Sequence, residues 1–199
     1  MGSMQHVQSH WTSSMQSPAS GFAHPRRNIA ALGIQGGMRV ADFGAGSGAY
    51  VLGIAERLGG SGKVYAIDVQ RDLLRRIHNE ATRLGYKNVE VICADLETPR
   101  ASKLADASVD LVLISNLLFQ VPDKPPVLKE ARRIVRSTGH LALIDWSESF
   151  GGMGPVRDDV VTKKNALALA EKSGFELTRE FSAGAHHYGL LFRPTTEHV

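Results

Sequence analysis

Residues 40–50 read Val-Ala-Asp-Phe-Gly-Ala-Gly-Ser-Gly-Ala-Tyr, and this stretch decides the fold. The apolar run over residues 38–43 predicts a buried strand, and apolar residues recurring at helical spacing predict a helix from residue 47 to 58. Three alternating glycines lie between the two elements. Because glycine has no Cβ atom, a ligand can approach this backbone closely, and the helix start presents unpaired N–H groups to it. The stretch therefore predicts a loop that binds a nucleotide-like ligand.

The rest of the chain alternates in the same way between short apolar runs and amphipathic segments. This alternation predicts an α/β fold, a Rossmann-like three-layer sandwich in which helices cover both faces of a mostly parallel sheet. The last two apolar runs are separated by a turn at residues 183–185, which is too short for a parallel crossover, so they are predicted to form an antiparallel hairpin. The predicted strands span 38–43, 63–67, 89–93, 109–114, 140–145, 175–182 and 186–192, and the predicted helices 25–32, 47–58, 73–84, 124–136 and 158–173.

Composition bounds the class of protein. The chain has 199 residues, of which 43% are hydrophobic and 22% charged, as is ordinary for a globular protein. Residues 1–20 are polar and predicted to be a disordered tail, and residues 21–199 are predicted to form a single domain. The tail lacks the apolar core of a secretory signal, and no apolar run is long enough to span a membrane. The net charge of +3 comes from scattered basic pairs and gives no strong nucleic-acid signal.

The single cysteine, Cys93, excludes a disulfide within the chain and a cysteine-based zinc site. No metal site is predicted. One cysteine also disfavours a thiol-based arsenic-methylating chemistry, and a reducing, cytoplasmic setting is the expected location. Because Cys93 lies in an apolar run, it is predicted to be packed and inert.

Three acids lie at the ends of predicted strands: Asp42, Asp68 and Asp95. Ligands of open α/β sheets bind beyond the carboxyl ends of the strands, so these side chains are predicted to face the ligand. Asp68 is placed to accept hydrogen bonds from ribose hydroxyls, and Asp95 to accept one from an adenine amino group, with the N–H of Leu96 donating to the ring. Asp42 directly precedes the glycine loop and is expected to attract a positively charged group.

Two classes of ligand remain open from the glycines alone. Gly44, Gly46 and Ala49 satisfy the G-x-G-x-x-G/A fingerprint of dinucleotide-binding oxidoreductases. A pyrophosphate over this loop would be repelled by Asp42. S-adenosylmethionine (SAM) has no phosphate and carries an ammonium and a sulfonium, and the helix start can hold its carboxylate. The charges therefore favour SAM, while an NAD(P)-dependent oxidoreductase stays an alternative.

Four stretches together resemble the class I SAM-dependent methyltransferases, in particular the group that includes the quinone-biosynthesis C-methyltransferases. They are Asp-Phe-Gly-Ala-Gly-Ser-Gly at 42–48, Ala-Ile-Asp-Val at 66–69, Cys-Ala-Asp-Leu at 93–96 and Asp-Leu-Val-Leu-Ile-Ser-Asn at 110–116. The resemblance covers about residues 25–192. It implies a seven-stranded sheet in the order 3-2-1-4-5-7-6 with strand 7 antiparallel, SAM as cofactor and S-adenosylhomocysteine (SAH) as product. The implied cofactor-binding residues are Asp42, Gly44, Ala45, Gly46, Asp68, Val69, Asp95, Leu96 and Asn116.

The catalytic residues are not determined by the sequence. Methyl transfer needs a general base only where the acceptor loses a proton. The candidates are Asp145 and Glu148, which follow the fifth strand, and His186 and His187, of which one is expected to face solvent and the other to pack on the sheet. Tyr50 is predicted to pack on the first helix rather than to bind.

The acceptor is also unidentified. We expect a small molecule, with segments 22–29 and 147–156 flanking its site. Many relatives carry a histidine where this chain has Phe119 and Gln120, so no catalytic role transfers there. The chain is expected to be a monomer or a homodimer, and a non-catalytic SAM-binding module is a further alternative.

Overall fold

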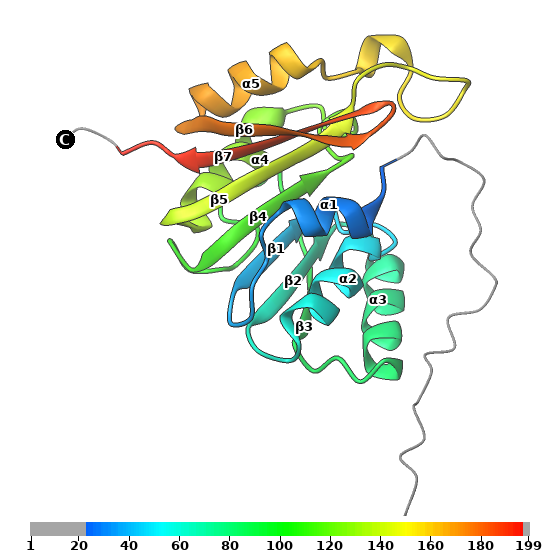
Figure 1. The fold of residues 1–199 in the computed structure, drawn as a ribbon, viewed down its shortest axis with the longest axis vertical. Coiled ribbons are helices and arrows are strands. Elements are labelled where there is room, and N and C mark those ends of the chain that lie inside the picture. Colours follow the sequence, from blue (N-terminus) through cyan, green and yellow to red (C-terminus); the bar gives the residue numbers. More distant parts are fainter. Residues whose placement is uncertain (1–22, 197–199) are drawn as a thin grey trace, which may run out of the picture.

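The computed structural model describes residues 23–196, and a seven-stranded sheet forms its centre (Figure 1). The strands lie in the order β3-β2-β1-β4-β5-β7-β6, which confirms the predicted order. Their bounds are β1 Arg39–Phe43, β2 Lys63–Asp68, β3 Val89–Cys93, β4 Val109–Ser115, β5 Val135–Trp146, β6 Phe175–Gly184 and β7 His187–Pro194. The helices are α1 Pro25–Ala31, α2 Ala49–Leu58, α3 Arg71–Arg83, α4 Lys124–Ile134 and α5 Lys163–Lys172, with a 3-10 turn at Arg157–Asp159. The predicted tail at residues 1–20 lies outside the described residues.

Strand direction follows the length of the connections. β1 to β5 pair in parallel and are joined through helices or long loops, whereas β7 pairs antiparallel with both β5 and β6. The predicted terminal hairpin is thus confirmed. Because the parallel strands all end at one edge of the sheet, Asp42 and Asp68 at the ends of β1 and β2 and Asp95 after β3 lie along that edge.

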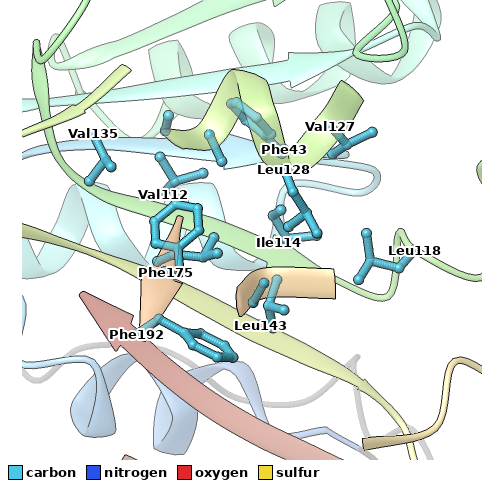
Figure 2. Packing of buried hydrophobic residues seen from close by; sticks show 14 of the residues in the cluster. Phe43, Val112, Ile114, Leu118, Val127, Leu128, Val135, Leu143, Phe175 and Phe192 are labelled. Carbon is cyan, nitrogen blue, oxygen red and sulfur yellow. The ribbon is translucent and has the colours of Figure 1, made fainter. Parts of the chain in front are cut away.

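Helices cover both faces of the sheet. One core cluster contains residues of α1, α2 and α3, and the other contains residues of α4 and α5. Figure 2 shows the second cluster, in which Phe43 of β1, Val112 and Ile114 of β4 and Leu143 of β5 pack together with residues of α4 such as Leu128. Each of these side chains is at most 1% exposed, and burying one contributes about 1.5–3 kcal/mol. The central strands therefore form a rigid base for the groups at their carboxyl ends.

Two local predictions are wrong. Cys93 is exposed, because β3 is an edge strand and its side chains are only partly covered. The predicted helix at 158–173 is broken: a 3-10 turn is followed by an extended residue, and α5 starts only after Thr162. The Thr162 hydroxyl accepts a hydrogen bond from the Asn165 N–H (3.3 Å) and caps this later start. Apolar spacing does not reveal such a cap.

Candidate functional site

The glycine loop connects β1 to α2 and is held by β2. The N–H groups of Gly44 and Ala45 donate to the Ile67 carbonyl at 2.8 and 3.1 Å. Gly48, the N-cap of α2, has φ +80°, and a Cβ atom there would lie 2.6 Å from Cγ1 of Ile77. Only glycine combines this conformation with such close packing. The loop is thereby pressed against α3 and leaves its outer side open to a ligand.

Asp42 lies at the end of β1, beneath this loop. Its side chain is 2% exposed and makes no hydrogen bond or ion pair with any residue in the range 23–196. Burial, and in second place the charge of Asp68, raises the pKa of Asp42 to about 7. A buried carboxyl without a partner is costly, and a cation brought to it would restore the ionised form.

Asp68 has a structural task that the sequence did not reveal. Its Oδ2 accepts a hydrogen bond from the Gly46 N–H and its Oδ1 accepts one from the Gln70 N–H, both at 2.9 Å. The carboxylate therefore fixes the glycine loop of β1 to the end of β2. Each oxygen keeps a further lone pair for another donor.

A cavity of about 270 Å³ opens between the glycine loop and the end of β4. Five of the nine predicted binding residues line it: Asp42, Gly44, Ala45, Gly46 and Asn116. The remaining lining residues are Ala23, Pro25, Ser47, Ala49, Tyr50, Ser115 and Gln120.

The other four predicted residues lie outside this cavity, at the ends of β2 and β3. Asp68 and Leu96 are buried, whereas Val69 and Asp95 are exposed. Asp95 accepts a hydrogen bond from the Glu97 N–H (3.0 Å) through Oδ1. These residues extend the edge beyond the cavity, toward β3.

Asn116 follows β4 in a conformation that non-glycine residues rarely adopt, with φ +53°. Its N–H donates to the Ile144 carbonyl (2.8 Å), and its carbonyl accepts from the Gln120 side chain. Its side-chain Oδ1 is buried and has no hydrogen-bond partner among the described residues. Strain combined with an unpaired polar atom is typical of a ligand site.

Tyr50 lies at the site, and Asn28, which the sequence did not identify, holds it there. Tyr50 packs in the core on the α1–α3 face, as the sequence predicted, and it also lines the cavity. The Asn28 amide donates to the Tyr50 hydroxyl (2.9 Å) and to the Ala183 carbonyl (3.2 Å). The pKa of Tyr50 is raised above its ordinary value, mainly because the side chain is buried. Asn28 thus ties α1, α2 and β6 together, a contact that no local signal could have predicted.

The four catalytic candidates lie apart from the cavity, on or beside β5 and β7. Asp145 shares the face of Leu143, which is the α4–α5 face and therefore opposite to Asp42. Burial raises the pKa of Asp145 to about 7, and N–H groups including those of Trp146, Leu118 and Phe119 oppose this shift. Asp145 therefore lies close to the loop that follows β4.

Glu148, His186 and His187 lie together where β5 ends and β7 begins. Nδ1 of His186 lies 2.8 Å from Oε1 of Glu148, and the His186 ring stacks on Phe150. His187 is 5% exposed and packs on Trp146, as predicted for one of the two histidines, whereas the His186 side chain is only 18% exposed and stacks on Phe150 instead of facing solvent. In residues 23–196, no group of three or more His, Cys, Asp or Glu side chains is arranged to hold a metal ion, and no helix is long and apolar enough to cross a membrane.

The fold and this edge of the sheet define a Rossmann-like domain with a cavity at the carboxyl ends of β1 and β4. Residues 34–188 match a family described as "Methyltransferase domain". The fold is similar to a SAM-dependent methyltransferase from Aquifex aeolicus, with a TM-score of 0.79 and 27% identity over 87% of this chain and 91% of that one. The chain belongs to this family of SAM-dependent methyltransferases, which confirms the resemblance of its motifs.

Two curated relatives mark the breadth of the family. The chain is 32% identical to an arsenite methyltransferase of Aquipseudomonas alcaligenes over 113 residues, which are 55% of this chain and 33% of that protein. It is 31% identical to a demethylmenaquinone methyltransferase of Listeria monocytogenes over 158 residues, 74% of this chain and 65% of that protein. The chain thus spans less than two thirds of the length of either relative.

Proposed function

We propose that this protein transfers a methyl group from SAM to a small-molecule acceptor. The observation that carries the proposal is Asp42, a buried carboxyl without a partner that faces the glycine loop. The α-ammonium group of SAM would supply the missing partner, whereas the pyrophosphate of a dinucleotide would be repelled. When bound, SAM supplies a methyl group that an electron pair of the acceptor attacks, and the sulfonium leaves as the neutral thioether of SAH.

The residues along the edge would hold the cofactor in a fixed order. Asp42 would accept hydrogen bonds from the ammonium, while the N–H groups at the start of α2, after Ser47, would bind the carboxylate. Asn116 would close over the methionine end, where its unpaired Oδ1 offers an acceptor. Alignment of this kind, with water excluded, contributes much of the acceleration of such a displacement.

The adenosine end would lie at the ends of β2 and β3. Asp68 would accept hydrogen bonds from the ribose hydroxyls with the lone pairs that the backbone leaves free, and Val69 would lie beside the ribose. Asp95 would accept a hydrogen bond from the adenine amino group, and the Leu96 N–H would donate to the ring. A cytoplasmic location, and a monomer or a homodimer, remain predictions from the sequence.

Calorimetric titration of SAH tests the cofactor assignment. We expect Asp68→Ala to weaken SAH binding at least tenfold, because both the ribose contact and the anchor of the glycine loop are lost. Asp72→Ala is the matched control, because Asp72 is an exposed acid close in the chain and outside the cavity. Unchanged affinity of the Asp68 variant would remove the ribose assignment.

A second assay separates an enzyme from a module that only binds SAM. The protein is mixed with SAM and with quinol, phenol, lipid or peptide acceptors, and the release of SAH is measured. Acceptor-dependent release is expected from at least one small-molecule class. Tight SAH binding without release from any class would favour the non-catalytic alternative.

A further inference from the structure

The carboxyl edge of the sheet continues past the cavity to β5 and β7. Ile144 of β5 and Leu191 of β7 belong to the core on the α1–α3 face. Side chains alternate along strands, so Trp146 and His187 point to that same face, which is also the face of Asp42. Trp146 and His187 are register partners, and their ring centroids lie 4.3 Å apart.

His187 carries polar atoms that the protein leaves unused. It is 5% exposed, and both of its ring nitrogens are buried without a hydrogen-bond partner among residues 23–196. Burial lowers the pKa of His187 to about 4, so the ring is neutral at pH 7 and offers one donor and one acceptor. Polar groups left unpaired in this way destabilise the fold, and their presence points to a ligand that pairs with them.

The segment after β5, residues 147–156, lies against this pair of rings. Gly154 has φ +74°, and a Cβ atom there would lie 2.5 Å from Cε2 of Trp146, so bare backbone covers the indole. The Ser147 N–H donates to the His186 carbonyl (2.8 Å), and His186 contacts Glu148 and Phe150 of the same segment. Figure 1 shows this segment beside the turn between β6 and β7. Displacing it would uncover Trp146 and open a path to His187.

We propose that Trp146 and His187 form the acceptor subsite, which takes a flat, uncharged ring system bearing a hydroxyl group. The ring system lies against the indole of Trp146, and its hydroxyl group donates a hydrogen bond to a ring nitrogen of His187. The inference rests on the proposed function, since it assigns the acceptor of that reaction. Glu148, which lies beside the subsite, pairs with His186 and so is not offered as a counter-ion to a charged acceptor.

The spacing of the strands sets the size of the acceptor. Only β5 lies between β4 and β7, so Asn116 and His187 are on the order of 10 Å apart at the usual strand separation. A fused two-ring system spans this distance. One end of such a molecule can therefore contact His187 while the other end reaches the cavity beside Asn116.

The test uses the full chain saturated with SAH and two probes, 2-naphthol and 2-methoxynaphthalene. The probes share their ring system, but only 2-naphthol can donate a hydrogen bond. We expect 2-naphthol to bind the wild-type protein about tenfold more tightly than it binds the His187→Phe variant, because the variant cannot accept the hydrogen bond from the naphthol hydroxyl group. The methoxy probe is expected to bind both proteins equally. His140→Phe, at the opposite end of the hydrogen-bonded part of β5, is the control variant and should change neither affinity.

Two further measurements keep the inference independent of the fold of the variant and of the proposed function. We expect His187→Phe to unfold at the same or a higher temperature than wild type and to bind SAH unchanged, because it removes unpaired nitrogens outside the SAM cavity. In wild-type protein, the ¹⁵N chemical shifts of the His187 ring should respond to 2-naphthol and not to the methoxy probe.

The outcomes separate the two proposals. SAH binding together with 2-naphthol affinity that is absent, or that does not depend on His187, would overturn the acceptor subsite and leave the proposed function standing. Loss of stability in His187→Phe with unchanged probe binding would show that His187 is only structural. Failure of wild-type protein to bind SAH at all would instead overturn the proposed function, and the subsite with it.

Discussion

Replacing Asp42 with asparagine tests the charge logic of the site most directly. The side chain keeps nearly its shape and loses only its ionisation. Burial raises the pKa of Asp42 from 3.8 to about 7, a difference of roughly 4 kcal/mol between the two protonation states. At pH 7 the unliganded protein therefore holds Asp42 as an even mixture of acid and carboxylate.

The raised pKa of Asp42 also determines whether the stability of the unliganded protein rises or falls with pH. A raised carboxyl pKa lowers the free energy of unfolding as the pH rises from about 4 to about 7, because the unfolded state ionises first. We therefore expect unliganded Asp42→Asn to be more stable than wild type at pH 8, with the difference vanishing near pH 4. Thermal unfolding at the two pH values measures this difference.

Folding of the unliganded protein favours the neutral form of Asp42, whereas ligand binding should favour its ionised form. An ammonium ligand binds the carboxylate, of which about nine tenths is present at pH 8 and about one tenth at pH 6. Wild-type affinity for SAH, relative to that of Asp42→Asn, should therefore fall about tenfold from pH 8 to pH 6. The ratio is the informative quantity, because the ammonium of SAH titrates identically in both experiments. Calorimetry at pH 6 in two buffers should also detect about one proton released by wild-type protein and none by the variant.

One result would refute this reasoning. If the affinity ratio is the same at pH 6 and pH 8, Asp42 does not contact the ligand cation. The buried carboxyl would then require another explanation, and the assignment of the ammonium to this edge would fail.

Two further predictions concern the scaffold. Gly62 and Gly60 share φ +83°, but a Cβ atom at Gly62 would lie 2.1 Å from the Met38 carbonyl, whereas at Gly60 nothing lies within 4 Å. In denaturant unfolding, Gly60→Ala should lower the free energy of unfolding by about 1 kcal/mol, and Gly62→Ala should lower it by at least about 2 kcal/mol more. Equal losses of stability in the two variants would contradict the close packing at Gly62. Glu130 is 4% exposed. Burial by itself would raise the pKa of Glu130, but the hydrogen bonds that Arg133 and Ser102 donate outweigh it and hold the pKa below its usual range. Glu130→Gln should lower the free energy of unfolding by about 3 kcal/mol at pH 7, and the difference should disappear as the pH falls through the lowered pKa; a difference that persists in acid would contradict the ion pair.

The sheet could be predicted because each strand carries its signal locally. Buried parallel strands are continuous apolar runs, as in β4, and the short turn before β7 allows only an antiparallel pairing. Exposure depends on what lies beside a strand, which no local signal records. Cys93 was predicted to be packed and is exposed, since no strand within residues 23–196 pairs with the outer side of β3.

The features of the candidate site also divide into those that local sequence predicts and those that depend on tertiary structure. The glycines and Asp42 are close together in the chain, so the sequence alone predicted that they would lie at one site, and they line one cavity. Asn28 and Ala183 are 155 positions apart, and their hydrogen bond arises only when α1 folds over the end of β6. The second task of Asp68, which anchors the loop of another strand 22 residues away, is likewise a product of tertiary structure.

Three polar groups without a protein partner within residues 23–196 lie along one edge of the sheet, on the face of Asp42 or at its margin. Asp42 at β1 and Asn116 at β4 face the cavity, and His187 at β7 lies beyond it on the same side. Each destabilises the unliganded protein, and a hydrophobic side chain in any of these positions would relieve that cost. A polar residue with a satisfied partner contributes to stability by itself, whereas we propose that these three gain their partners from ligands. Stability and ligand affinity should therefore change in opposite directions when each is replaced by an uncharged or apolar residue of similar shape, and a merely structural group would change both in the same direction.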